Sequence, residues 1–491
     1  MKRIVAVLLG ALMVLVAGCT PQPEAPSTEM IIGATAQPPS MDPVTSDSAA
    51  IPQVLLYNVY ETLIKIDNDG QMQPLVAKQW QVSDDRLTYT FTLDERATFA
   101  DGRKVTAADV VWNIERVQKQ GTPVLKNQLK PVTSAQATDE QTVVVTLSAP
   151  SNAWLYSMTS TAGMIIDPKA SDLAARPAGT GPYTLSSWSK GADLVLGQRD
   201  NYWGTKPYAT KVTFRYFSDP NAMNASMLSG GLDVISNLQA PQALPQFGDT
   251  ARFQVIEGTT QGEVVMGFNH QTPALKDKRI RQAINHAIDR EALLKTVWGG
   301  KGTLIGSMVP PTDPWYEDLS DTYPYDPEKA KQLIAESGQS DITLRLRVPT
   351  LPYATASAQF IASQLGEVGI SVVIDELEFP ARWLDLVLTK ADYDMTIVSH
   401  VEPRDIVKWG DPKYYWRYDN AEVGTLLASA DSGTEAEQIE DMKKVAKILA
   451  DDAVADFLFL LPNLVIAKPD ITGMPQNAST LSFDLTGISR G

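Results

Sequence analysis

Few side chains in this sequence are of the types that carry out covalent or metal chemistry. Cys19 is the only cysteine, and the three histidines, His270, His286 and His400, lie far apart along the chain. The sequence contains no GxSxG elbow, no HExxH pair, no phosphate-binding glycine loop followed by lysine and no paired cysteines. Its 58 acidic residues offer many carboxylates, but no spacing singles out a glycosidase-like pair. We therefore predict no catalytic residue, no cofactor and no metal site.

Cys19 follows a segment with the plan of an export signal. Two basic residues, Lys2 and Arg3, precede an apolar run over residues 4–17, and small residues lead into the cysteine in VAGC at 16–19. The run is about 14 residues long, shorter than the ~20 that span a bilayer. This end resembles a bacterial lipobox, which implies removal of residues 1–18 and diacylation of Cys19. The alternative is an ordinary secretory signal with an incidental cysteine.

Composition restricts the remainder of the chain. The 491 residues are 44% hydrophobic and 20% charged, which indicates a globular protein of two or three domains. The net charge is −16, and becomes −18 without Lys2 and Arg3, which argues against a nucleic-acid or anionic-membrane surface. Residues 19–30 include the Pro-rich stretch TPQPEAPSTEM, which predicts a flexible tether before a folded body that starts near Met30.

Helices and strands alternate in the second part of the chain. Apolar residues at helical spacing run from Ile280 to Ile288, and Asp326 before Pro327 predicts a helix start that Gly338 ends. A further helical pattern over 358–368 stops at Gly369 and is followed by a β-branched run at 370–377. Helix followed by strand indicates an α/β body.

Residues from about 80 to 150 follow a different pattern. LTYTFTL at 87–93 and TVVVTLS at 142–148 predict strands around a single clear helix, whose apolar stripe includes Val110, Ile114 and Val117. Thr106 and Asp109 have the spacing of a capping box at the start of that helix. We predict a separate α+β lobe here.

Several segments, which together cover nearly all of the mature chain, form an ordered set of motifs: AQPPSMDP at 36–43, YETLIKIDNDGQMQPLVAKQW at 60–80, the stretch at 83–117, GTGPYTL at 179–185, NYWG at 201–204, residues 268–293, YDPEKAKQLIAESG at 325–338 and WRYDNAEVGTLLASA at 416–430. In their order and spacing they resemble the family 5 extracellular solute-binding proteins, the oligopeptide, dipeptide and nickel receptors of ABC importers.

The resemblance implies a type II periplasmic-binding-protein fold (cluster C), with two main lobes joined by a hinge and an extra α+β lobe. Lobe I would combine residues 30–58, 178–268 and 475–491; lobe II would be 59–177, and lobe III 269–474. Ligand would bind between lobes I and III, hinge closure would bury it, and an ABC permease with its ATPase would receive it.

One position departs from the peptide-binding members of that family. Their D-x-x-[DE]-P motif supplies an aspartate for the α-ammonium of a peptide, whereas SHVEP at 399–403 places Ser399 there. Because a buried ammonium without a counter-charge costs several kcal/mol, this substitution argues against the usual mode of peptide binding. Glu402 could replace the missing charge if the loop is shifted; otherwise it is a solvated carboxylate beside Pro403.

Aromatic and guanidinium side chains follow that motif and could stack on a flat ligand or clamp an acidic group. The alternative is that the aromatics pack in the core and the arginines face water. The ligand-binding candidates are Ser399, His400, Glu402, Arg404, Trp409, Tyr415, Trp416 and Arg417, with Asn269 near the hinge and Ser40 and Met41 on the facing lobe.

Taken together, the sequence predicts a monomeric, lipid-anchored receptor outside the cytoplasmic membrane that delivers a peptide-like or other small solute to an ABC importer. Two other classes stay open at this point. One is a sensor that presents its liganded form to a signalling partner, and the other is an enzyme or assembly factor on a borrowed binding fold.

Overall fold

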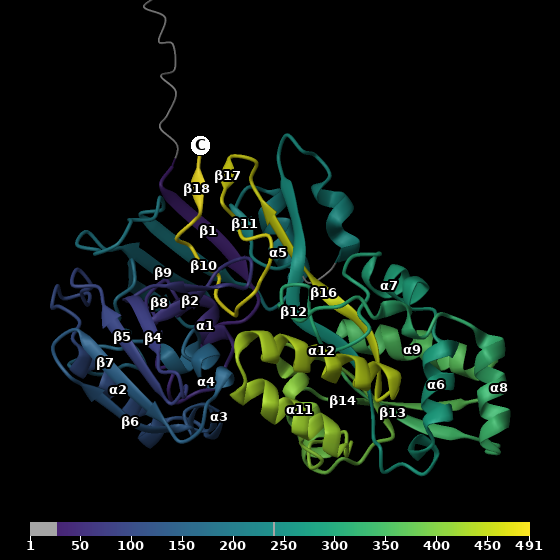
Figure 1. Cartoon of the computed structure of the whole chain (residues 1–491). Coiled ribbons are helices and arrows are strands. Elements are labelled where there is room, and N and C mark those ends of the chain that lie inside the picture. The colour runs from purple at the N-terminus through teal and green to yellow at the C-terminus, as the bar shows by residue number, and fades with distance from the viewer. Residues whose placement is uncertain (1–26, 239–240) are drawn as a thin grey trace, which may run out of the picture.

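The computed structural model describes residues 27–238 and 241–491, and Figure 1 shows them as two halves joined by long central strands. The predicted signal peptide and Cys19 lie outside the described residues. The first regular element, β1 (Glu29–Ala34), begins one residue before the start predicted for the folded body. Among the described residues, no helix is both long enough and apolar enough to cross a membrane.

A ten-stranded mixed sheet runs through both halves. Its order is β14 (Ser371–Leu377), β13 (Thr343–Pro349), β15 (Met395–His400), β12 (Gln254–Phe268), β16 (Ala455–Ala467), β11 (Val234–Ile235), β1, β10 (Lys211–Tyr216), β9 (Asp193–Gln198) and β8 (Tyr183–Ser189). Two small pairs accompany it, β2 (Ile64–Ile66) with β3 (Met72–Pro74) and β17 (Ile471–Thr472) with β18 (Ser489–Arg490).

The antiparallel strands β12 and β16 join the two halves. Residues 254–259 of β12 lie beside the end of β16 that pairs with β11, and residues 263–268 pair with β15 on the other side. The β12–β16 register shifts between Thr259 and Glu263 and again between Val264 and Val265. Because a bulge bends a strand and increases its twist, the two halves of the sheet take different directions at this point.

The second half of the molecule, residues 269–454, has an apolar cluster on each face of its sheet. Val264 and Met266 of β12 belong to one cluster and Val265 to the other, as expected when successive side chains of a strand point to opposite faces. Its helices are α6 (Lys278–Ala287), α7 (Arg290–Trp298), α8 (Pro327–Ser337), α9 (Pro352–Glu367), α10 (Ala381–Trp383), α11 (Ala421–Ser432) and α12 (Glu435–Asp451).

Three of these elements confirm the sequence predictions. Helix α8 begins after Asp326, whose side chain accepts a hydrogen bond from the Lys329 N–H, and ends at Gly338 in the left-handed conformation. Helix α6 buries Ile280, Ala283, Ile284 and Ala287, while α9 is followed by β14, as the pattern at 358–377 predicts.

The first half of the molecule, residues 27–235 with the C-terminal segment 471–491, contains the predicted α+β region. There a four-stranded sheet, β4 (Ala77–Val82), β5 (Thr88–Leu93), β7 (Thr142–Leu147) and β6 (Val132–Ala137), packs against α2 (Ala107–Gln120). The capping box between Thr106 and Asp109 is present, which confirms that prediction. The remaining helices of this half are α1 (Ala50–Leu55), α3 (Pro123–Gln128), α4 (Asn152–Ser157) and α5 (Pro220–Leu228).

A buried carboxylic acid in the first half makes its stability depend on pH. Glu61 is 1% exposed and accepts hydrogen bonds from the Tyr202 hydroxyl at 2.6 Å and the Trp203 indole N–H at 3.0 Å. Burial raises the pKa of Glu61 to about 7, although these donors and Arg199 oppose the shift.

We expect Glu61→Gln to flatten the pH dependence of unfolding. The native state holds this proton more tightly than the unfolded chain, whose Glu pKa is about 4.3. The contribution of Glu61 to the free energy of unfolding is therefore fully present below about pH 4. As the pH rises to about 7, this contribution falls by roughly 3 kcal/mol. Urea unfolding at pH 5 and pH 8 measures this change. An equally steep decline in the variant would contradict it.

Candidate ligand-binding site

A polar cluster lies at the end of β15, where the strand leaves the central sheet. His400 is buried, and its two ring nitrogens contact Asp405 at 3.2 Å and the Tyr415 hydroxyl at 2.9 Å. Asp405 begins the short helix η6 (Asp405–Gly410) and is also buried. His400 is therefore held on both sides by protein groups.

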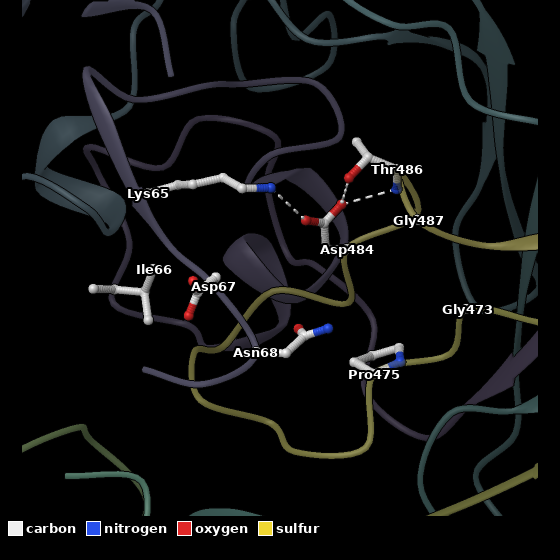
Figure 2. Close-up of a pocket in the computed structure, with 9 residues that line it drawn as sticks. All are labelled: Lys65, Ile66, Asp67, Asn68, Gly473, Pro475, Asp484, Thr486 and Gly487. Carbon is white, nitrogen blue, oxygen red and sulfur yellow. Dashed lines mark hydrogen bonds and ion pairs between the residues drawn. The ribbon is translucent and has the colours of Figure 1, made fainter. Parts of the chain in front are cut away.

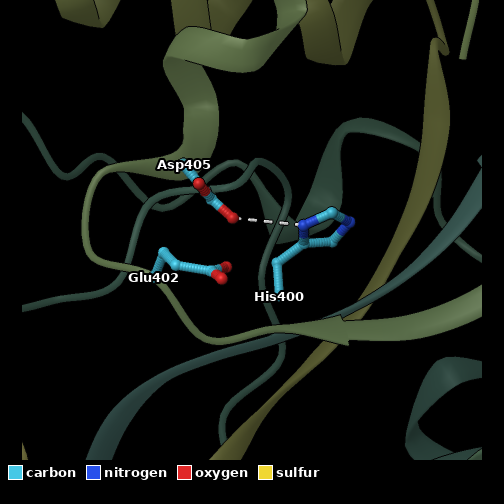
Figure 3. A group of neighbouring side chains, drawn as sticks. All are labelled: His400, Glu402 and Asp405. Carbon is cyan, nitrogen blue, oxygen red and sulfur yellow. Dashed lines mark hydrogen bonds and ion pairs between the residues drawn. The ribbon is translucent and has the colours of Figure 1, made fainter. Parts of the chain in front are cut away.

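Glu402 completes a group of three in the loop between β15 and η6. Ligand atoms of His400, Glu402 and Asp405 all lie within 4.8 Å of one another. Figure 3 shows the Glu402 carboxylate pointing toward the other two side chains, although the residue as a whole is exposed. Burial of the carboxyl, and then the charge of Asp405, raise the pKa of Glu402.

Glu263 is the neighbour of His400 on the next strand. The two residues are direct partners in the antiparallel β12–β15 pair, so their side chains project from the same face of the sheet. Glu263 is 0% exposed, and neither of its carboxylate oxygens has a hydrogen-bond partner among the residues that the structure describes. Burial raises its pKa well above the ordinary value, and the negative charges of Asp405, Asp313 and Glu402 add to this shift.

Two further buried groups near Glu263 have unused acceptor atoms. Asp313 is 8% exposed, and its Oδ2 has no hydrogen-bond partner; burial raises its pKa to about 6, against the opposing charge of Arg404. The Gln261 side chain donates to the Thr312 hydroxyl at 3.1 Å, while its Oε1 is also buried and without a partner. Four acceptor oxygens of this region thus have no partner among the described residues, and three donors, the Arg404 Nε and the indole nitrogens of Trp315 and Trp416, have none either.

Arg404 connects this cluster to the first half of the molecule. Its backbone is left-handed, with φ of 63°, and its guanidinium lies 3.7 Å from the ring centre of Tyr156 and 4.7 Å from that of Trp315. Tyr156 belongs to α4 of the first half. A cation between two aromatic rings gains about 0.5–2 kcal/mol from each well-placed face, so this contact favours the approach of the two halves.

Helices α4 and α11 make a second set of contacts between the halves. The Asn152 side-chain amide donates to the carbonyl oxygens of Ala430 at 2.9 Å and Gly433 at 3.1 Å. The Asp431 carboxylate accepts from the Ala153 N–H at 2.8 Å and the Ser151 hydroxyl at 3.1 Å. The halves are thus directly joined by hydrogen bonds at the end of the molecule away from the central strands (Figure 1).

The aromatic residues predicted to contact ligand lie in the core of the second half. Trp409 and Trp416 stack with ring centres 3.7 Å apart, and each is 1% exposed. Tyr415 is equally buried, and its hydroxyl forms a hydrogen bond with the His400 Nε2 at 2.9 Å. The Tyr393 hydroxyl donates to the Tyr415 carbonyl oxygen, also at 2.9 Å. Tyr415 and Trp416 contact the His400 ring at the end of β15, with ring centres 6.1 Å and 5.2 Å away.

The other predicted residues lie in different surroundings. Arg417 donates to the Lys413 carbonyl, and Asn269 donates to the carbonyls of Ala391 and Tyr393, which ties the end of β12 to the segment before β15. Met41 is 0% exposed within the core of the first half. The Ser40 hydroxyl accepts from the Asp42 N–H at 3.1 Å. A ligand contact by any of these residues stays a prediction.

Ser399 does not point in the same direction as His400. It is the partner of Val264 in the sheet, so its side chain lies on the face opposite to Glu263 and His400. Its N–H donates to the Tyr353 hydroxyl at 2.9 Å, and its Oγ is buried without a partner.

A separate hollow of about 160 Å³ lies between the β2–β3 hairpin and the C-terminal segment (Figure 2). Its charged groups are already paired: Lys65 contacts Asp484 at 3.2 Å, and Asp484 also accepts from the N–H and hydroxyl of Thr486. None of the residues that line this hollow belongs to the His400 cluster, and we assign it no ligand.

Sequence reasoning missed several residues of the cluster, above all Glu263, Asp313, Gln261, Tyr156 and Trp315. One signal was available for Glu263, because it is the only charged residue in the apolar stretch GEVVMGF at 262–268. A carboxylate inside a buried strand is rarely tolerated without a partner or a function. Asp313 and Tyr156 come close only through the tertiary fold, and no sequence spacing indicates them.

The fold and this cluster define a type II periplasmic binding protein, with two main lobes, a hinge and an extra α+β lobe. The substrate-binding protein CtaP of Listeria monocytogenes superposes with a TM-score of 0.84 at 25% identity, covering 94% of this chain and 99% of that one. NikA of Brucella suis, solved with Fe(III)-EDTA, gives a TM-score of 0.83 at 21% identity, over 94% of this chain and all of the other. This confirms the predicted fold class.

The chain belongs to the bacterial extracellular solute-binding proteins, family 5, whose model matches residues 71–431. It is 29% identical over 481 residues to the probable D,D-dipeptide-binding periplasmic protein DdpA of Escherichia coli K12, covering 92% of each chain. It is 27% identical over 352 residues to the glutathione-binding protein GsiB of Salmonella paratyphi A, covering 70% of this chain and 68% of that one. The family resemblance is confirmed.

Proposed function

We propose that this protein captures a small, peptide-like solute between its two halves and delivers it to the permease of an ABC importer. The observation that carries the proposal is the buried cluster around Glu263, whose acceptor atoms lack hydrogen-bond partners among the described residues. Membership of a family of solute-binding proteins supports the same function. Such groups are normally satisfied in folded proteins, so a bound solute is the expected partner. The protein performs no chemistry on the solute.

The mechanism is closure linked to binding. Contacts such as Arg404 with Tyr156 and Asn152 with α11 hold the two halves together. A solute that contacts both halves favours this arrangement by its differential affinity for the closed form. The closed form is then the one that the permease recognises. Relatives named for dipeptides and for glutathione support a solute of peptide-like size.

Native mass spectrometry of the protein as purified tests this proposal. A solute of a few hundred daltons, released on denaturation and bound again by the stripped protein, is the expected result. Continuous chemical turnover of that solute by the purified protein would instead indicate an enzyme on this fold. A stripped protein that binds neither the released solute nor any peptide would count against the receptor function.

A second part of the proposal is that Cys19 carries the lipid that holds the protein at the outer face of a membrane. The position of the cysteine after a short apolar run supports this. Two acyl chains anchor stably, whereas one holds only marginally. The tether would then keep the binding halves near the permease and raise their effective concentration there.

We expect Cys19→Ser to move the protein from the membrane fraction to the soluble extracytoplasmic fraction, or to leave it with its signal uncleaved. Detergent partitioning and intact-mass measurement distinguish the acylated from the unmodified chain. Solute affinity should be unchanged, because Cys19 precedes the folded body by about ten residues. Unaltered membrane association of the variant would show that the cysteine is not the anchor.

A further inference from the structure

Glu263 lies in surroundings that an isolated carboxylate does not tolerate. It is 0% exposed, its two oxygens accept no hydrogen bond from any described residue, and it occupies a strand inside the main sheet. A buried carboxylate costs several kcal/mol unless it is protonated or paired with a cation. In its ionised form this residue therefore needs a cationic partner that the described chain does not supply.

The groups around Glu263 increase that need. The charges that act on it most strongly, those of Asp405, Asp313 and Glu402, are all negative. The nearby cation, Arg404, instead lies between the rings of Tyr156 and Trp315. Three buried carboxyl groups, with the carboxyl of the exposed Glu402 beside them, favour a positively charged ligand over a neutral or anionic one.

The donor atoms fit an amine better than a metal ion. Both nitrogens of His400 are engaged, with Asp405 and the Tyr415 hydroxyl, so the imidazole would have to break a contact to coordinate a metal. The unused acceptors are oxygens: both of Glu263, one of Asp313 and one of Gln261. A protonated amine carries up to three N–H donors on one nitrogen and needs such acceptors.

We propose that the solute carries a protonated amine and that Glu263 supplies its counter-charge, with Asp313 and Gln261 as neighbouring acceptors. This inference rests on the proposed receptor function and names the class of solute that the same site takes. It also accounts for the serine at position 399. The negative charge lies on the adjacent strand, next to Val264, the partner of Ser399.

Isothermal titration of the stripped full-length mature protein with matched probes tests this assignment. The probes are L-alanyl-L-alanine and D-alanyl-D-alanine, each with its N-acetyl derivative, and the solute released from the purified protein. The variants are Glu263→Gln and, as a matched control on the same strand, Glu257→Gln, whose exposed side chain pairs with Lys301.

We expect at least one free-amine probe, or the released solute, to bind, and N-acetylation to weaken binding at least about tenfold. Glu263→Gln should weaken the binding of the free-amine probe by at least about tenfold, while Glu257→Gln should leave its affinity unchanged. The Glu263→Gln protein should melt no lower than the wild type, because the change removes an unpaired buried carboxyl group.

Three results would overturn the inference while leaving the receptor function in place. They are equal binding of the free and acetylated probes, unchanged affinity of Glu263→Gln, and a released solute that contains no basic nitrogen. Binding of Ni²⁺ alone that is lost in Glu263→Gln would also overturn it, in favour of a metal site. If no probe or released solute binds, both the inference and the receptor function fail.

Discussion

Trp416→Ala is expected to lower the free energy of unfolding by about 3–5 kcal/mol, the usual range for removing a large buried aromatic side chain. Trp416 stacks on Trp409 at 3.7 Å and also lies within 5.2 Å of the ring centres of His400, Tyr414 and Tyr415. The substitution therefore removes several aromatic contacts as well as buried area.

The effect of this change should extend to solute binding, because the Trp416 ring packs against His400 of the candidate site. Urea unfolding of the variant measures the loss of stability. Trp188→Ala is the matched control, because Trp188 is only partly buried on the edge strand β8. Its removal should lower the free energy of unfolding much less. A loss for Trp416→Ala no greater than for the control would contradict the packing described here.

Asn152→Ala should weaken solute affinity by about 10- to 100-fold without touching the solute. The change removes two hydrogen bonds to carbonyl oxygens at the end of α11, each worth about 0.5–1.5 kcal/mol. These two bonds join the halves, so their loss reduces the closed population. The apparent affinity then falls by the same fraction as the population that can bind.

Titration with the solute released from the purified protein measures this effect, and small-angle scattering of the variant reports the closed population directly. Asn221→Ala on α5 is the control, because Asn221 is an exposed residue far from the contact between the halves. Unchanged affinity and unchanged scattering of Asn152→Ala would show that the α4–α11 contact does not contribute to closure.

The sequence predicted the local elements well because their signals are short-range. Asp326 and Gly338 bound α8 through cap geometry that involves only neighbouring residues, and the same holds for Thr106 and Asp109 at α2. The fold class followed from motifs spread over nearly the whole chain. The predicted lobe boundaries stay a proposal, because β12 and β16 belong to both halves of the sheet.

The candidate site was harder to predict because its geometry depends on strand register. Whether Glu263 faces His400 or Ser399 is decided by a shift of one residue in the β12–β15 register, and no sequence pattern indicates that register. The family's D-x-x-[DE]-P motif indicates an acidic ligand contact only at position 399. The aromatic run at 414–418 matched both a binding surface and a core, and only tertiary packing shows that Tyr415, Trp416 and Tyr418 are buried.

Small-angle scattering of the stripped protein, with and without its released solute, tests the central claim most directly. We expect the radius of gyration to fall on addition of the solute, because binding favours the closed arrangement in which α4 contacts α11 and Arg404 contacts Tyr156. Saturation with the solute and no change in the radius of gyration would contradict a receptor that closes around its ligand.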